Sequence, residues 1–184
     1  MPLLRPTLLV AALFLSAALP AQAGLLGNNV TVDYNYLVPA YTTDVVTVTA
    51  GIEITCTGGG TGNANLCSAL TAPNQYLDIG DSTISYQYTG STNGGFNPVT
   101  PNGMTFHDLD VAGALVNVAL VTDISGLTLS RVSFTDSTLT IELGGLSLGT
   151  SGGFTLTLTV PEPGGLGVLA TLLGGLGLLR RRRA

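Results

Sequence analysis

The chain has 184 residues, with 6 lysine and arginine residues against 11 aspartate and glutamate residues, for a formal net charge of −5 at neutral pH. Residues 24–160 contain ten of the acids and a single basic residue, Arg131, so this segment alone carries a net charge of −9. A surface this anionic repels phosphate backbones and anionic lipid headgroups, which excludes a nucleic-acid-binding role. The same charge favours cations as binding partners.

Residues 1–23 predict a secretory signal peptide. Arg5 precedes a nearly continuous apolar run over residues 8–19, and Ala21-Gln22-Ala23 supplies the small residues that signal peptidase accepts. As a helix, that run would span roughly 18 Å, well short of the ~30 Å hydrocarbon core of a bilayer. Cleavage is therefore favoured over a membrane anchor, and the mature protein is expected to begin near Gly24.

The segment 24–160 predicts an all-β domain. Apolar and polar residues alternate, as in strands with one buried and one solvated face, along residues 30–36, 84–88 and 154–160. Less regular apolar runs, separated by turn-forming residues, occupy residues 45–55, 115–122, 127–134 and 138–143. No part of the segment shows a convincing helical repeat. About seven to nine short strands joined by turns predict an antiparallel β-sandwich, with a barrel as the alternative.

Cys56 and Cys67 are the only cysteines of the chain. In a protein bound for an oxidising compartment, they predict a disulfide across a glycine-rich loop, worth about 2–3 kcal/mol on the chain-entropy model. The spacing of the two cysteines does not favour a redox pair, because it is longer than in redox motifs. It does not favour a metal site either, because the single histidine is 40 residues away.

His107 is the only histidine and lies beside Asp108 and Asp110. The chain has no Gly-x-Ser-x-Gly or comparable nucleophile motif, so we expect no catalytic residues, and we interpret His107 as a histidine at a strand end. Asp108 and Asp110 are candidates for a Ca²⁺ site at a loop, although aspartate is equally common in turns. The metal assignment stays open, and no cofactor is predicted.

Residues 161–184 form a third segment. Residues 164–179 are uncharged and would span roughly 24 Å as a helix, just enough to cross a bilayer when the flanking prolines and arginine stems lie in the interfaces. A membrane stop signal follows, formed by Arg180, Arg181, Arg182 and Arg183. Clustered positive charge stays on the cytoplasmic side, which places the β-domain outside. From these residues alone, a plain C-terminal membrane anchor remains an alternative interpretation.

Val160-Pro161-Glu162-Pro163, followed by a short apolar helix and an arginine cluster, resembles the PEP-CTERM sorting signal of exported proteins in Gram-negative, biofilm-forming bacteria. The resemblance implies that Pro161, Glu162 and Pro163 are the processing motif read by exosortase, an integral-membrane cysteine transpeptidase. Exosortase removes such tails as the protein reaches the cell surface or the exopolysaccharide matrix. Residues 104–110 and 125–160 are also similar to small PEP-CTERM proteins that have no assigned activity.

Together these features predict an exported surface or matrix protein without catalytic activity. Its expected partners are signal peptidase and exosortase during export, with a transient stay in the inner membrane. The alternative is a Ca²⁺- or saccharide-binding β-sandwich module, for which exopolysaccharide or Ca²⁺ would be the ligand. Against the saccharide interpretation, the chain has no tryptophan, and its tyrosines mostly occupy inward positions of the predicted strands.

Overall fold

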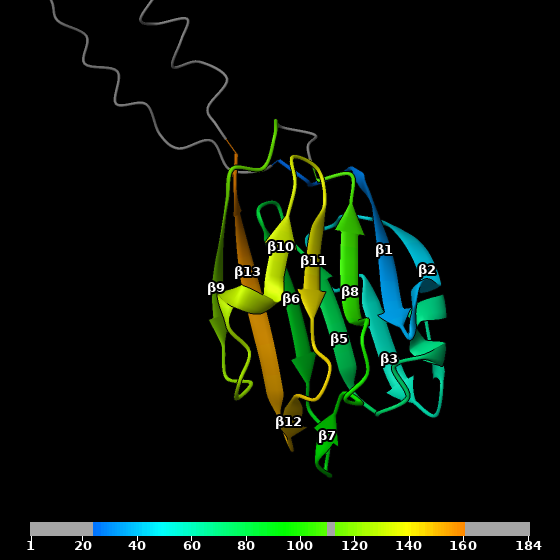
Figure 1. Cartoon of the computed structure of the whole chain (residues 1–184). Helices are drawn as coiled ribbons and strands as arrows, with labels where there is room; N and C mark the ends of the chain where they lie inside the picture. The colour runs from blue at the N-terminus through cyan, green and yellow to red at the C-terminus, as the bar shows by residue number, and fades with distance from the viewer. Residues whose placement is uncertain (1–23, 110–112, 161–184) are drawn as a thin grey trace, which may run out of the picture. The chain divides into compact units, whose positions relative to one another are not determined.

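A computed structural model describes residues 24–109 and 113–160, and this part of the chain is an all-β domain of antiparallel sheets (Figure 1). It contains two short 3-10 helices, η1 (Asn65–Ser68) and η2 (Leu129–Arg131). Its thirteen strands are β1 (Asn29–Tyr36), β2 (Val38–Thr47), β3 (Ile54–Gly58), β4 (Thr61–Gly62), β5 (Gln75–Ile79), β6 (Thr83–Tyr88), β7 (Gly94–Gly95), β8 (Asn102–His107), β9 (Asn117–Thr122), β10 (Val132–Phe134), β11 (Leu139–Glu142), β12 (Ser147–Gly149) and β13 (Gly152–Thr159).

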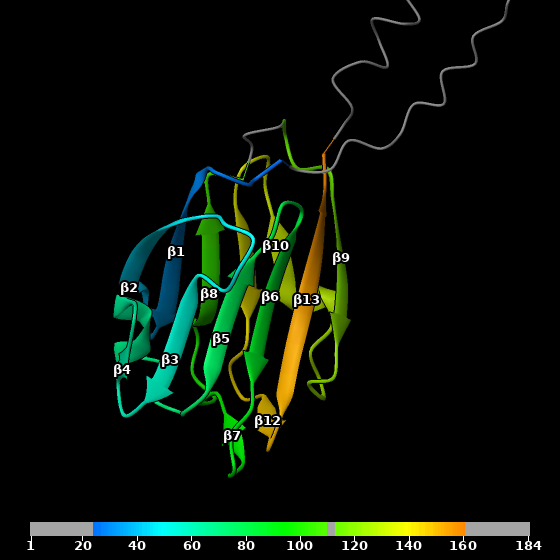
Figure 2. The same ribbon diagram turned by 180° about the vertical axis from the view of Figure 1, so that it is seen from behind.

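Two large sheets face each other in a sandwich-like arrangement. One sheet has five strands in the order β10-β11-β8-β1-β2 and lies in front in Figure 1. The other has six strands in the order β4-β3-β5-β6-β13-β9 and lies in front in Figure 2. The prediction of an all-β antiparallel fold is confirmed. The structure has more strands than the seven to nine predicted, because it also contains four very short strands of two or three residues each, β4, β7, β10 and β12.

The core lies between the two large sheets. Tyr86 of β6 and Phe154 of β13 are paired on neighbouring strands of the six-stranded sheet, and their rings stack with centroids 5.5 Å apart. Met104 and Phe106 of β8 are fully buried in the same hydrophobic cluster. Burying such side chains contributes roughly 1.5–3 kcal/mol each before conformational entropy is subtracted.

Strand β1 departs from the predicted alternation at its end. Val30, Val32 and Tyr34 are buried as expected, but a register shift between Tyr34 and Tyr36 interrupts the pairing with β2. Asn35 is buried and Tyr36 is only half-buried. The pairing of β1 with β8 continues without a break through Tyr36, so the irregularity lies on the β2 side, where three residues separate Val38 from Thr42.

The predicted strand over residues 45–55 is wrong, because β2 ends at Thr47 and β3 begins only at Ile54. Among the longer strands, β5, β8 and the first seven residues of β2 were not predicted, and the short β4, β7 and β12 fall in segments that were expected to be turns. Strand β8 lacks alternation because Asn102, Gly103 and Met104 are all buried. A Cβ atom at residue 103 would collide with the carbonyl oxygen of Ile141, so glycine allows the close approach of β8 and β11.

The predicted helices at both ends of the chain fall on residues 1–23 and 161–184, outside the described residues. In the part of the chain that the structure describes, no helix is long and apolar enough to cross a membrane.

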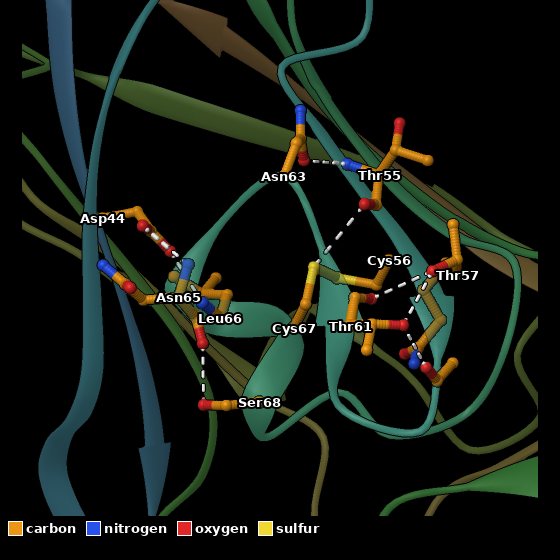
Figure 3. The surroundings of a disulfide bond; sticks show 12 residues. Asp44, Thr55, Cys56, Thr57, Thr61, Asn63, Asn65, Leu66, Cys67 and Ser68 are labelled. Atoms are coloured by element: carbon orange, nitrogen blue, oxygen red, sulfur yellow. Dashed lines mark hydrogen bonds between the residues drawn. A yellow bond between two sulfur atoms is a disulfide. The ribbon is translucent and has the colours of Figure 1, made fainter.

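A disulfide joins Cys56 of β3 to Cys67 of η1, with an S–S distance of 2.01 Å and a Cα–Cα distance of 5.1 Å (Figure 3). The adjacent β4 must contain glycine, because a Cβ atom at residue 62 would collide with Cys67 Sγ and with the carbonyl oxygen of Thr55. From the other sheet, the Asp44 carboxylate of β2 accepts hydrogen bonds from the backbone N–H groups of Asn65 and Leu66, at 2.9 and 2.7 Å. Helix η1 is therefore held by both sheets.

We expect the double substitution Cys56→Ala/Cys67→Ala to lower the free energy of unfolding by about 3 kcal/mol, because the unfolded chain regains the entropy of a loop of this length. Chemical denaturation of both proteins measures the difference. Dithiothreitol should destabilise the wild type by a similar amount and leave the double variant unchanged. Equal stability of all four samples would contradict a structural role for the disulfide.

Candidate functional site

A groove of about 360 Å³ opens at one end of the sandwich. It lies at the start of β5, where Gln75 lines it, whereas the start and the end of the described domain meet at the opposite end of β5. There, Leu25 N–H and Leu158 N–H donate to the carbonyl oxygens of Asp81 and Ser82 in the β5–β6 turn. The groove therefore lies at the pole away from the points where the chain enters and leaves the domain.

Two tyrosines form the accessible aromatic wall of the groove. The rings of Tyr36 and Tyr41 meet edge to face, with centroids 5.9 Å apart, and Tyr41 is 54% exposed. The Tyr36 hydroxyl accepts a hydrogen bond of 3.0 Å from Asn97 Nδ2. Its own O–H, the Tyr41 hydroxyl and Asn97 Oδ1 make no side-chain hydrogen bond to the described residues. These groups are available to a ligand.

Two buried amides support the wall from behind. Asn102 is 1% exposed, accepts a 2.7 Å hydrogen bond from the Tyr34 hydroxyl and donates to the Asn97 carbonyl oxygen. Gln75 is 3% exposed, accepts a 2.6 Å hydrogen bond from the Tyr86 hydroxyl and donates to the Ala72 carbonyl oxygen. Both amides connect core tyrosines to backbone at the groove, and their burial is compensated by these hydrogen bonds.

Burial also changes the acidity of these core tyrosines. Loss of solvation raises the pKa of Tyr34 to about 12, and nearby Tyr36 adds to the effect. Burial raises the pKa of Tyr86 further, with Tyr34 and Tyr88 contributing. Both hydroxyls therefore remain hydrogen-bond donors to the amides over the physiological pH range.

Unusual backbone conformations gather around the groove. Of the four described non-glycine residues with positive φ, Leu37 joins β1 to β2, Ala40 lies in the irregular start of β2, and Asn74 immediately precedes Gln75. The β1–β2 turn is held by Asn35, which is 6% exposed and accepts a 2.9 Å hydrogen bond from Ala40 N–H. Left-handed backbone is costly for leucine and alanine, and such strain concentrates at functional sites.

The groove is lined by uncharged side chains. None of the described residues that line it is an aspartate, glutamate, histidine, lysine or arginine, so it offers no carboxylate or imidazole and no anionic ligand for a metal ion. It presents aromatic faces, phenol hydroxyls and a free amide oxygen. Such a surface suits an uncharged ligand that carries hydroxyl groups.

His107 lies away from this groove, at the end of β8. Its Nε2 is 3.0 Å from Asp33 Oδ2, and Thr43 Oγ1 donates to the other oxygen of the same carboxylate at 2.6 Å. In a catalytic triad the hydroxyl contacts the imidazole, whereas here it contacts the acid. The cluster therefore has an imidazole and a carboxylate but lacks the order of groups that activates a nucleophile.

Of the two candidate metal ligands, only Asp108 lies within the described residues. Asp108 accepts a 3.0 Å hydrogen bond from Thr31 Oγ1, and Asp110 lies outside the described residues. Within residues 24–109 and 113–160, no three His, Cys, Asp or Glu side chains form a group that could hold a metal ion.

The predicted processing motif, Pro161, Glu162 and Pro163, and the predicted stop signal, Arg180, Arg181, Arg182 and Arg183, also lie outside the described residues. Comparison with models of known protein families, with curated proteins and with solved structures finds no match for this chain. The resemblance of its C-terminal segment to a sorting signal therefore stays a prediction.

The groove was not predicted from the sequence, because the tyrosines were expected to point mostly inward. Tyr34, Tyr86 and Tyr88 are buried, but Tyr36 and Tyr41 line the groove. One available signal was the unusual placement of amides in strand-forming segments, at Gln75 and Asn102. An amide in a strand that is otherwise apolar needs a buried partner, and here both partners are core tyrosines.

We expect Tyr34→Phe to lower the free energy of unfolding by about 1–3 kcal/mol at pH 8, because Asn102 Oδ1 loses its donor while still buried. The folded-state pKa of Tyr34, about 12, lies above the unfolded value near 10, so its contribution is complete below pH 10 and is lost as the pH rises through 12. The variant should therefore lose less stability than the wild type between pH 10 and pH 12.

Urea denaturation at pH 8 and at pH 11.5 measures both effects. Tyr41→Phe is the matched control, since its hydroxyl has no hydrogen-bond partner among the described side chains and its ring is exposed. An unchanged stability of Tyr34→Phe at pH 8 would show that the buried amide is not held by this hydroxyl.

Proposed function

We propose that the chain is an exported, non-catalytic protein that is delivered through its C-terminal PEP-CTERM signal and displayed on the cell surface or in the exopolysaccharide matrix of a Gram-negative bacterium. The observation that carries the proposal is that the groove and the two ends of the domain lie at opposite poles. Both ends of the described domain meet at the β5–β6 turn, and the ligand-accessible groove opens at the other pole. A domain tethered or delivered by its terminal segments would present this groove outward.

Two further properties support an extracellular location. The Cys56–Cys67 disulfide requires an oxidising compartment to persist. The segment 24–160 is strongly acidic and has no lysine, which keeps copies apart by electrostatic repulsion. Both properties suit a protein that works outside the cytoplasm by being displayed there.

A saccharide-binding module is the second candidate function, and the groove is the observation that favours it. The groove supplies two accessible tyrosine rings, which the inward placement expected from the sequence did not provide. The two candidates are compatible, because a protein delivered to an exopolysaccharide matrix needs a means of staying there. Ca²⁺ binding has no comparable support among the described residues.

We expect intact-mass spectrometry of the protein recovered from its host to show loss of residues 1–23 and of everything after about Pro163. The triple substitution Pro161→Ala/Glu162→Ala/Pro163→Ala should keep the tail and shift the protein to the membrane fraction, because the processing motif is gone. Inactivating the exosortase of the host should have the same effect.

Asp136→Ala is the control, since it removes an exposed acidic side chain of the β-domain and leaves the tail unchanged. A wild-type protein that keeps its C-terminus and stays in the membrane would leave a plain anchor as the role of this segment and overturn the sorting proposal.

A further inference from the structure

We infer that the groove lined by Tyr36, Tyr41 and Asn97 binds a neutral saccharide chain, presented at the pole opposite to the termini of the domain. The inference deepens the proposed function and rests on it for the source of the ligand, which is the exopolysaccharide matrix. Four properties of the described residues carry it: the aromatic wall, the free hydrogen-bonding groups, the absence of charge in the lining, and the buried support.

The aromatic wall suits the apolar face of a sugar ring. Tyr36 and Tyr41 come from either side of the β1–β2 turn and hold their rings at 70° to each other. A sugar presents its C–H groups on one face and its hydroxyls around the edge, so a tyrosine can contact the face with its ring and the edge with its O–H. The volume of about 360 Å³ lies within the range of small-ligand sites, which begins at about 300 Å³.

The free polar groups of the groove include donors and acceptors. The Tyr36 O–H is free to donate because its oxygen already accepts from Asn97 Nδ2, and Asn97 Oδ1 is free to accept. The hydroxyls of Tyr41 and of Thr71, another lining residue, can do either. Sugar hydroxyls also donate and accept, so each of these groups finds a partner. A run of prolines offers carbonyl acceptors but no backbone N–H to donate to Asn97 Oδ1.

The charge of the domain selects a neutral ligand. The lining residues within the described part of the chain carry no formal charge, and the domain around them has a net charge of −9 over residues 24–160. An anionic polysaccharide would meet repulsion from the domain without any cation in the groove to compensate. A neutral polymer has no net charge and is not repelled by the negative charge of the domain.

The groove is also built in advance of the ligand. Of the four buried polar residues in the described domain, Gln75 and Asn102 line the groove and Asn35 holds the turn between its two tyrosines. Apolar residues of similar size would avoid the cost of burying amides. The amides instead hold the wall in one conformation, which lowers the ordering cost that a weak, multi-hydroxyl ligand would otherwise have to overcome.

The test uses the full chain with its disulfide intact, in a detergent without a sugar headgroup. Cellohexaose, xylohexaose and chitohexaose are the neutral probes, and an alginate hexasaccharide and a proline-rich decapeptide are the competitors. Titrations are followed by calorimetry and by NMR of isotope-labelled tyrosines. We expect at least one neutral hexasaccharide to bind and to shift the Tyr36 and Tyr41 signals. Tyr41→Ala should weaken binding by about tenfold or more, as truncation of an aromatic anchor does.

Tyr76→Ala is the matched control, because Tyr76 is a half-buried tyrosine of β5 that does not line the groove. It should leave the affinity unchanged. Circular dichroism establishes that both variants fold. The inference is overturned if no neutral hexasaccharide binds, if Tyr41→Ala binds as well as the wild type, or if the alginate or the peptide binds more tightly.

The outcome is separable from that of the sorting proposal. Removal of the C-terminal tail in the host without any saccharide binding would overturn the groove inference alone. Saccharide binding by a protein that keeps its tail would overturn the delivery route and leave the groove inference standing.

Discussion

The Cys56–Cys67 disulfide is the constraint on which one side of the molecule depends. It fastens η1 to β3 of the six-stranded sheet, while the Asp44 carboxylate of β2 holds the first N–H groups of the same short helix. The chain continues from η1 directly into residues 69–72, which form one wall of the groove. A helix of four residues has no stability of its own, so these covalent and polar attachments determine where that wall lies.

The groove is continuous with the core through hydrogen bonds. Tyr34 and Tyr86 are core side chains whose hydroxyls reach Asn102 and Gln75, and these amides in turn bind backbone at the rim. Packing of the sheets therefore fixes the rim as well as the interior. This coupling explains how a domain with a simple apolar core can hold an ordered polar surface at one pole, without charged side chains at that site.

The proposed function assigns different roles to different parts of the chain. In that proposal, delivery would depend on the terminal segments, whose predicted signals lie outside the described residues, and ligand recognition would depend on the groove at the far end of β5. Between them, the outer face of the five-stranded sheet carries the polar cluster of His107, Asp33 and Thr43. Its order of contacts suits cross-strand stabilisation of β8, β1 and β2 rather than chemistry.

The sequence alone determined the all-β antiparallel class, the cysteine pair and the apolar faces of β6 and β13, because these follow from local alternation and composition. It also supplied the prediction of terminal sorting segments. Only the tertiary structure decided the rest. The irregular start of β2 places Tyr41 beside Tyr36, and the pairing of distant strands brings Tyr34 and Asn102 into contact. These outcomes depend on register and on contacts across 68 residues of chain, which no local pattern encodes.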